Sequence, residues 1–252
     1  MNKISEKKHF RLDGAELKLI ALAAMTIDHI GLIFFPGLSV FRIIGRIAYP
    51  IFAYMIAEGC RYTRNKKRYL SSVFGVGLLC SAVNYLVERS LYQCILVTFG
   101  CSILIIFALD TLQKENARRK KVLTAAGAAA FLIFLYYVNG ISLPGLSLPG
   151  GRIREIFLET GFRMDYGFFG ILTPAAVWMV KTKTGKLSAL AAGLCLISGE
   201  IGGVQIFSLA ALIPLAFYSG RRGKTGGKNF FYVYYPAHLA VLYGIAQLIQ
   251  TA

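Results

Sequence analysis

The chain has 252 residues, of which 56% are hydrophobic and 16% are charged, and its formal net charge is +16. A soluble protein carries charge at about a quarter of its positions, so this composition excludes an ordinary soluble domain. The basic excess does not indicate nucleic-acid binding, because the charges form short patches between apolar segments and leave no soluble domain to bind a groove. The five cysteines are scattered within or at the ends of apolar segments and form no CxxC pair, so we interpret them as small buried side chains.

Nine apolar segments follow one another along the chain, and most approach the roughly twenty residues that a helix needs to cross the hydrocarbon layer. The predicted spans are 17–36, 40–58, 69–87, 92–111, 122–139, 166–180, 187–199, 204–218 and 230–250. Because 187–199 and 204–218 are short, they could also form one re-entrant hairpin, so we predict eight or nine spans. The expected fold class is an all-α polytopic transmembrane helix bundle, with residues 1–252 forming a single domain.

Basic residues alternate from gap to gap between these spans. Five alternate gaps hold 22 of the 28 Lys and Arg residues: 1–18, 60–68, 113–121, 181–186 and 219–229. This alternation is the positive-inside pattern of a polytopic membrane protein, and it predicts a cytoplasmic N-terminus. On the predicted outer side, the long gap 140–164 combines a Pro/Gly-rich start with helical spacing, so we expect a loop and a short amphipathic helix.

Four ionisable residues in the first two spans are expected to meet. Asp28 and His29 lie past the middle of the first span, and as neighbours they are about 100° apart on a helix, so they can face different partners. Arg42 and Arg46, four residues apart at the outer end of the second span, share one face. Ionisable groups inside a bilayer are costly, so this group indicates a functional pocket in the external half. The simpler alternative is an Asp28–Arg46 ion pair that only holds two helices together.

Other polar residues lie near the ends of the spans. Glu58 ends the second span near the cytoplasmic side, and Pro50 is expected to kink the helix before it. His238 lies in the inner half of the last span, where a lone histidine is as often a helix-to-helix hydrogen-bond partner as a functional group. Three further polar residues lie on the outer side, at the start of the sixth span and in a turn: Asp165, Tyr166 and Glu200.

An acid, a histidine and two arginines suit two different functions. One is a proton or ion relay in a transporter. The other is general-base catalysis, in which histidine takes a proton from a hydroxyl or amine and arginine stabilises negative charge. No metal site is predicted, since HExxH is absent and the chain has only three histidines, and the GxSxG motif of serine hydrolases is absent too. The residues alone leave transporter and enzyme open.

Four stretches of the sequence carry a resemblance to a known family. They are LKLIALAAMTIDHIG, FRIIGRIAYPIFAYMIAEGCRYTRNKKRYL, DYGFFGIL and FFYVYYPAHLAVLYGI. In this order they resemble the TraX family, integral membrane proteins named for the F-pilin N-acetylase. That family is similar to transmembrane acyltransferases, which move acyl groups from a cytosolic acyl-CoA to acceptors at the outer face.

The resemblance implies an acetyltransferase of the bacterial inner membrane, with acetyl-CoA as the donor. The acceptor would be an amine or hydroxyl group on an external pilin-like peptide or envelope glycan. By the motif match, His29 takes the role of general base with Asp28 beside it, and Arg42, Arg46 and His238 support them. A proton-coupled transporter of a small solute and a non-catalytic envelope assembly factor are the alternatives.

The predicted topology assigns the two substrates to opposite sides. The phosphates of acetyl-CoA need cationic partners on the cytosolic side. The predicted partners are in two basic gaps: Arg61, Arg64, Lys67, Arg68, Arg221, Arg222 and Lys224. Four residues are assigned to the acceptor: Asp165, Tyr166, Glu200 and Glu58.

Overall fold

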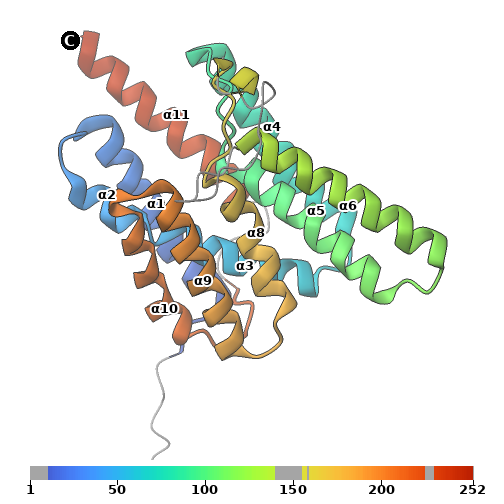
Figure 1. The fold of residues 1–252 in the computed structure, drawn as a ribbon. Helices are drawn as coiled ribbons and strands as arrows, with labels where there is room; N and C mark the ends of the chain where they lie inside the picture. The colour runs from blue at the N-terminus through green and yellow to red at the C-terminus, as the bar shows by residue number, and fades with distance from the viewer. Residues whose placement is uncertain (1–10, 140–154, 158, 225–229, 252) are drawn as a thin grey trace, which may run out of the picture.

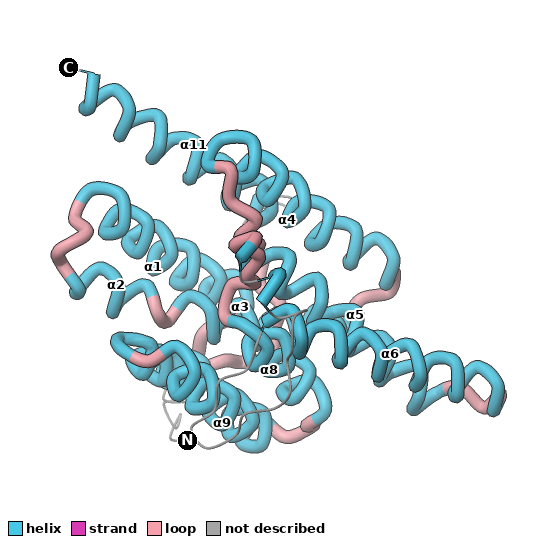
Figure 2. Tube along the Cα trace, turned by 45° about the horizontal axis from the view of Figure 1, so that its top comes forward, coloured by secondary structure: helices cyan, strands magenta, loops and turns pink. Residues whose placement is uncertain are grey.

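The structure, a computed structural model, describes residues 11–139, 155–157, 159–224 and 230–251. This part of the chain is helical and contains two isolated bridges but no strand (Figures 1 and 2). The helices are α1 (Gly14–Phe34), α2 (Ser39–Gly45), α3 (Ala48–Tyr62), α4 (Lys66–Glu88), α5 (Ile95–Lys114), α6 (Arg118–Asn139), α8 (Gly167–Met179), α9 (Lys183–Ile201), η1 (Gly203–Ala211), α10 (Leu212–Ala216) and α11 (Phe230–Thr251). The all-helical fold class is confirmed, whereas most of the amphipathic helix predicted in 140–164 lies outside the described residues.

Each predicted span falls on a helix, but the second span is divided into α2 and α3. The break lies at Arg46 and Ile47. Pro50 accounts for it, because a proline ring collides with the carbonyl group four residues earlier, here that of Arg46. Pro50 itself lies in the first turn of α3, where its missing N–H group leaves no helical hydrogen bond unmade. The predicted kink before Glu58 is therefore confirmed as a break.

The predicted span 204–218 is not a regular α-helix. It begins with the 3-10 helix η1 and continues into the short α10. Three residues per turn place Gln205, Ser208 and Ala211 above one another, and all three are buried. This face of η1 packs against α2, α3 and α9.

Five segments are long and apolar enough to cross a membrane by their length and composition: α1, α2 together with α3, α4, α5 and α6. The segments α8 and η1–α10 are apolar but shorter. Large apolar side chains such as Leu123 on α6 and Val233 on α11 are exposed, as suits a surface that contacts lipid. These features indicate a membrane protein, while the count of eight or nine spans and the cytoplasmic N-terminus stay predictions.

The helix α3 lies at the centre of the bundle and contacts α1, α5, α8, α9 and η1. Its Tyr49, Ile51 and Tyr54 side chains are almost fully buried and belong to the main apolar core. A second, smaller core joins Leu22 and Met25 of α1 to Tyr235 of α11. The helix α11 packs mainly on α1 and α4, and its far half leads away from the bundle at the top of Figure 1.

The described parts of the five basic gaps lie at one end of the bundle, which we call the basic end (Figure 1). Leu12 in the first gap exchanges backbone hydrogen bonds with Phe217 and Ser219 beside the last gap. Lys183 donates to the carbonyl oxygens of Ala216 and Tyr218 at 2.6 and 2.9 Å, which joins the fourth gap to the last. The structure thus brings together segments that the charge alternation assigns to one side of a membrane.

Two side-chain contacts connect the remaining basic gaps to this end. Arg61, in the second gap, donates to the carbonyl oxygens of Trp178 and Val180, where α8 ends. Lys66 pairs with Asp110 of α5 at 2.5 Å and joins the second gap to the third. At the opposite end, the backbone of Gln93 bonds to Arg163 and Asp165, so the residues just before α5 lie beside the residues just before α8.

Candidate functional site

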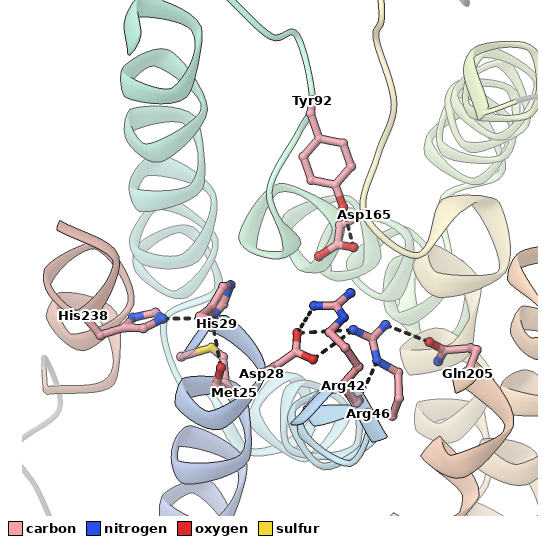
Figure 3. A network of polar contacts seen from close by, with 9 residues as sticks. All are labelled: Met25, Asp28, His29, Arg42, Arg46, Tyr92, Asp165, Gln205 and His238. Carbon is pink, nitrogen blue, oxygen red and sulfur yellow. Dashed lines mark hydrogen bonds and ion pairs between the residues drawn. The ribbon is translucent and has the colours of Figure 1, made fainter. Parts of the chain in front are cut away.

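The helix α1 presents two neighbouring polar residues to two different helices (Figure 3). Asp28 faces Arg42 and Arg46 across the short turn to α2, and His29 faces His238 of α11. The predicted divergence of Asp28 and His29 on the helix is therefore confirmed. Instead of one shared pocket, the structure has a charge network and a histidine pair on adjacent faces of α1.

The charge network has a carboxylate between two guanidinium groups. Arg42 Nη1 lies 2.7 Å from Asp28 Oδ2, and Arg46 Nη2 lies 3.2 Å from both Asp28 oxygens. The Asp28 and Arg46 side chains are only 14% and 12% exposed, whereas Arg42 is 33% exposed. One carboxylate faces two cations, so the network has surplus positive charge where Arg42 is more open to its surroundings.

Gly45 makes the close approach of α1 and α2 possible. A Cβ atom at this position would lie 2.2 Å from Asp28 Oδ1 and 2.3 Å from Asp28 Cβ, which no real side chain tolerates. Gly31 has the same role nearer the turn between the two helices, because a Cβ atom there would lie 2.2 Å from Phe41 Cβ. The two glycines let the helix backbones lie close enough for Asp28 to contact both arginines.

Gln205 is a member of the network that sequence reasoning missed. Its Oε1 atom accepts a hydrogen bond from Arg46 Nη1 at 3.0 Å, and its side chain is 1% exposed. Its Nε2 atom and the Ser208 hydroxyl are buried without a hydrogen-bond partner among the described residues. The presence of a glutamine in an otherwise apolar segment was the only available signal, and it did not identify Arg46 as the partner.

The histidine pair joins α1 to α11. His29 Nδ1 lies 2.9 Å from the Met25 carbonyl oxygen and 3.1 Å from His238 Nε2. His238 Nδ1 lies 3.0 Å from the Tyr234 carbonyl oxygen. The prediction that His238 lies at a different depth from His29 is therefore wrong, because α11 crosses α1 so that the two rings meet.

These contacts determine which nitrogen atoms carry protons when both rings are neutral. A carbonyl oxygen only accepts, so both Nδ1 atoms must donate. His238 Nε2 is then the acceptor for the shared Nδ1–H of His29, and His29 Nε2 is left unprotonated and without a partner among the described residues. An unprotonated imidazole nitrogen with no partner is the state that a general base requires.

Two of the predicted acceptor residues, Asp165 and Tyr166, lie at the opposite end from the basic gaps. The Tyr92 hydroxyl donates to Asp165 Oδ1 at 2.6 Å, and the Tyr166 ring stacks on Tyr49 with its centroid 4.0 Å away. Loss of contact with water raises the pKa of the Asp165 carboxyl above its ordinary value, although Tyr92 and Arg46 oppose this change. Arg46 also lies over the Tyr166 ring, at 6.0 Å from its centroid, which places this group beside the charge network.

Glu200 lies close to the start of α8. A Cβ atom on Gly167 would approach the Glu200 carboxylate at 3.1 Å. The Oε2 atom of Glu200 is buried without a hydrogen-bond partner among the described residues. Asp165, Tyr166 and Glu200 therefore surround the beginning of α8, as the assignment to one outer site requires.

Glu58 does not lie with these residues, and its assignment to the acceptor side is corrected. Its Oε1 atom is 2.5 Å from Lys186 Nζ of α9, and the two side chains are 8% and 10% exposed. Glu58 is in the last turn of α3, twelve residues and about 18 Å along the chain from Arg46. The buried lysine stabilises its charge at the basic end of the bundle, so Glu58 is part of the helix packing there.

The predicted coenzyme-binding residues differ in their surroundings. Arg61 is occupied by the carbonyl oxygens at the end of α8. Arg64, Lys67, Arg68, Arg221, Arg222 and Lys224 are exposed at the basic end. Among the residues that the structure describes, no three His, Cys, Asp or Glu side chains lie close enough together to hold a metal ion.

The fold and the site define a class of protein: a helical membrane protein in which an acid, two guanidinium groups and a histidine pair lie where α1, α2 and α11 meet. The chain belongs to the TraX protein family, whose match covers residues 13–148 and 154–246. The family resemblance inferred from the sequence motifs is thus confirmed.

Two curated relatives are similar to the chain. The probable fimbrial assembly protein FimC, serogroup H1, of Dichelobacter nodosus is 24% identical over 93% of this chain and 96% of the relative. The uncharacterized protein RP591 of Rickettsia prowazekii (strain Madrid E) is 38% identical over 34% of this chain and 38% of the relative. No solved structure gives a significant match.

Proposed function

We propose that the protein is an acetyltransferase of the bacterial inner membrane that moves an acetyl group from cytosolic acetyl-CoA to an amine or hydroxyl group at the outer face. The observation that supports this function best is the histidine pair, because its hydrogen bonds leave His29 Nε2 unprotonated and available. Membership of the TraX family also supports this reaction class, since the family is associated with pilin acetylation.

His29 acts as the general base in this proposal. Its Nε2 atom takes the proton from the acceptor as the acceptor nitrogen or oxygen attacks the thioester carbonyl carbon. The carbon–sulfur bond then breaks, and the proton passes from His29 to the leaving sulfur. His238 positions the imidazole ring of His29, because His238 Nε2 accepts the Nδ1–H of His29. The Tyr234 carbonyl oxygen in turn accepts the Nδ1–H of His238 and so fixes the tautomer of His238.

The charge network and the residues near α8 have supporting roles. Arg42 keeps donors outside its bond to Asp28 and is the more exposed of the two arginines, so it stabilises negative charge that develops on the thioester oxygen. Asp165 and Glu200 attract an amine acceptor on a pilin-like peptide or envelope glycan, and Tyr166 lies beside them. Arg64, Lys67, Arg68, Arg221, Arg222 and Lys224 are the candidate partners of the coenzyme phosphates at the basic end.

The test uses the purified full-length protein in lipid nanodiscs with radiolabelled acetyl-CoA. Slow hydrolysis of acetyl-CoA, or transfer to a primary amine, is expected for the wild type. The His29→Ala variant should lose this activity, while the exposed Cys195→Ala control retains it. Dissipation of a solute gradient in liposomes without any acetyl transfer would instead establish a transporter.

The name of the Dichelobacter nodosus relative favours a second candidate, a non-catalytic assembly factor for fimbriae. This function depends on surfaces rather than on an unprotonated imidazole nitrogen. A fimbriation assay in the native host separates the two candidates. An assembly factor keeps its function in the His29→Ala variant, whereas an acetyltransferase whose product is needed for assembly does not.

A further inference from the structure

A line of contacts between α1 and α11 runs from the basic end to the histidine pair, and we call it the α1–α11 seam. Lys18 Nζ lies 5.1 Å from the centroid of the Phe231 ring. Further along, the Thr26 hydroxyl is 2.8 Å from the Tyr234 hydroxyl. The third contact is the one between His29 and His238. Lys18, Thr26 and His29 are eight and three residues apart, so they lie on one face of α1.

The basic end of the seam holds two cations close together. Arg222 lies against the start of α1, because a Cβ atom on Gly14 would be 3.1 Å from the Arg222 carbonyl oxygen. Lys18 follows Gly14 by about one helical turn and lies on the same side of α1. The backbone holds this arrangement, because Gly14 N–H donates to the Arg221 carbonyl oxygen at 2.8 Å and fixes the last basic gap against the start of α1.

Neither cation has a carboxylate partner. Among the described residues, neither Lys18 nor Arg222 forms an ion pair. The acids at this point, Asp13 and Glu16, cap α1 instead: Asp13 accepts from the N–H groups of Ala15 and Glu16, and Glu16 accepts from that of Asp13. Because these two carboxylates accept N–H groups of the helix start, the charged groups of Lys18 and Arg222 keep their donors for a phosphate-bearing ligand.

The length of the seam adds a second, independent observation. Lys18 and His29 are eleven residues apart on α1, which corresponds to about 16 Å along the helix axis. An extended phosphopantetheine arm has a similar length. A ligand with its phosphates at Lys18 and Arg222 therefore brings its far end to the free His29 nitrogen.

We propose that the α1–α11 seam is the donor site, in which Lys18 and Arg222 bind the phosphates of a 3′-phosphorylated adenosine diphosphate group and the attached arm runs along the seam to His29. The inference rests on the proposed acetyl transfer. It assigns the acetyl-CoA site to the last basic gap, which carries Arg222. The gap between α3 and α4 is the less suitable one, because Arg61 is used at the end of α8 and Lys66 pairs with Asp110.

Equilibrium binding of coenzyme A and of adenosine 3′,5′-bisphosphate to the full-length protein in nanodiscs tests the phosphate end. Lys18→Gln and Arg222→Gln should each weaken the binding of coenzyme A at least tenfold. Arg119→Gln is the matched control, because it removes an exposed charge from the same end of the bundle on α6. Lys18→Arg keeps the charge and should bind like the wild type, which excludes misfolding as the cause.

The outcomes separate this inference from the proposed function. If the wild type binds coenzyme A and the two Gln variants bind it equally well, the seam is not the donor site, whereas the proposed acetyl transfer still stands. If Lys18→Arg binds as weakly as Lys18→Gln, the charge is not what matters and the seam is again wrong. If the wild type binds neither coenzyme A nor the bisphosphate, the proposed function fails and the seam fails with it.

Bromoacetyl-coenzyme A tests the far end of the seam. A histidine nitrogen displaces bromide from the methylene carbon and forms a stable carbon–nitrogen bond, which peptide mass spectrometry locates. We expect alkylation of His29 in the wild type, a slower reaction in Arg222→Gln, and none at this position in His29→Ala. Alkylation confined to peptides outside α1 and α11 would overturn the route.

Discussion

The two faces of α1 around Asp28 and His29 differ in how completely their polar groups are used. On one face, the Asp28 carboxylate is enclosed by two guanidinium groups, and Arg46 is bound further by Gln205. On the other, His29 uses one ring nitrogen for Met25 and His238 and keeps the second unpaired among the described residues. A carboxylate paired with two cations suits a structural role, whereas an available basic nitrogen suits the proposed chemistry. We therefore expect the adjacent residues Asp28 and His29 to differ in function.

The largest expected effect comes from His29→Ala. Loss of a general base lowers the rate of acetyl transfer by roughly 10²–10⁴-fold. The thermal midpoint of unfolding in detergent should change little, because the ring is only partly buried. If the variant kept an activity within twofold of the wild type, His29 would be a packing residue. The two faces of α1 would then not differ in function.

Asp28→Ala should act on stability instead. It leaves Arg42 and Arg46 facing each other without a carboxylate, which costs about 3 kcal/mol when the charges are largely buried. Chemical denaturation in mixed micelles measures this loss. The double variant Asp28→Ala/Arg42→Ala should regain part of it, because one of the two unpaired cations is then absent. A double variant that is less stable than both single variants would contradict the ion-pair explanation.

Gly45→Ala should separate α1 from α2. The added Cβ atom would lie 2.2 Å from Asp28 Oδ1, so the helices must move apart, at a cost of about 1–3 kcal/mol. Gly37→Ala is the matched control in the turn between these helices, because nothing lies within 4 Å of its Cβ position. Equal thermal midpoints for the two variants would show that the close approach does not stabilise the charge network.

The smallest effect is expected from Tyr234→Phe on the histidine face. The Thr26 hydroxyl donates to the Leu22 carbonyl oxygen, so the Tyr234 hydroxyl is the donor in the bond between the two side chains. Its removal should cost about 1 kcal/mol. Tyr62→Phe, at a side chain that is 70% exposed, serves as the control and should change nothing. A strong loss of acetyl transfer in Tyr234→Phe would instead assign the hydroxyl to the reaction.

Much of the local arrangement could be predicted from the sequence, because it depends on spacing within one or two helices. The positions of the helical segments follow from hydropathy, and the break before Pro50 follows from proline geometry. The meeting of Asp28 with Arg42 and Arg46 follows from the short turn that joins their helices, although the expected pocket shared with His29 is not observed. Each of these predictions uses residues close together in the chain.

The contacts that were missed join segments far apart in the sequence. His238 pairs with His29 across 209 residues, and the angle at which α11 crosses α1 determines the depth at which they meet. Gln205 reaches Arg46 from a 3-10 helix, and Lys186 neutralises Glu58 from α9. Hydropathy gives the boundaries of a span but neither its tilt nor its neighbours, so these partners could not be identified from it.

The backbone contact between the start of α1 and the last basic gap has a consequence for biosynthesis. Gly14 binds Arg221, a residue that the ribosome adds about two hundred positions later. During synthesis, α1 is therefore made long before the loop that fixes its first turn. Because such a distant closure must wait until the last loop has been made, the contact between Gly14 and Arg221 forms late, and shortened chains that lack this loop cannot make it.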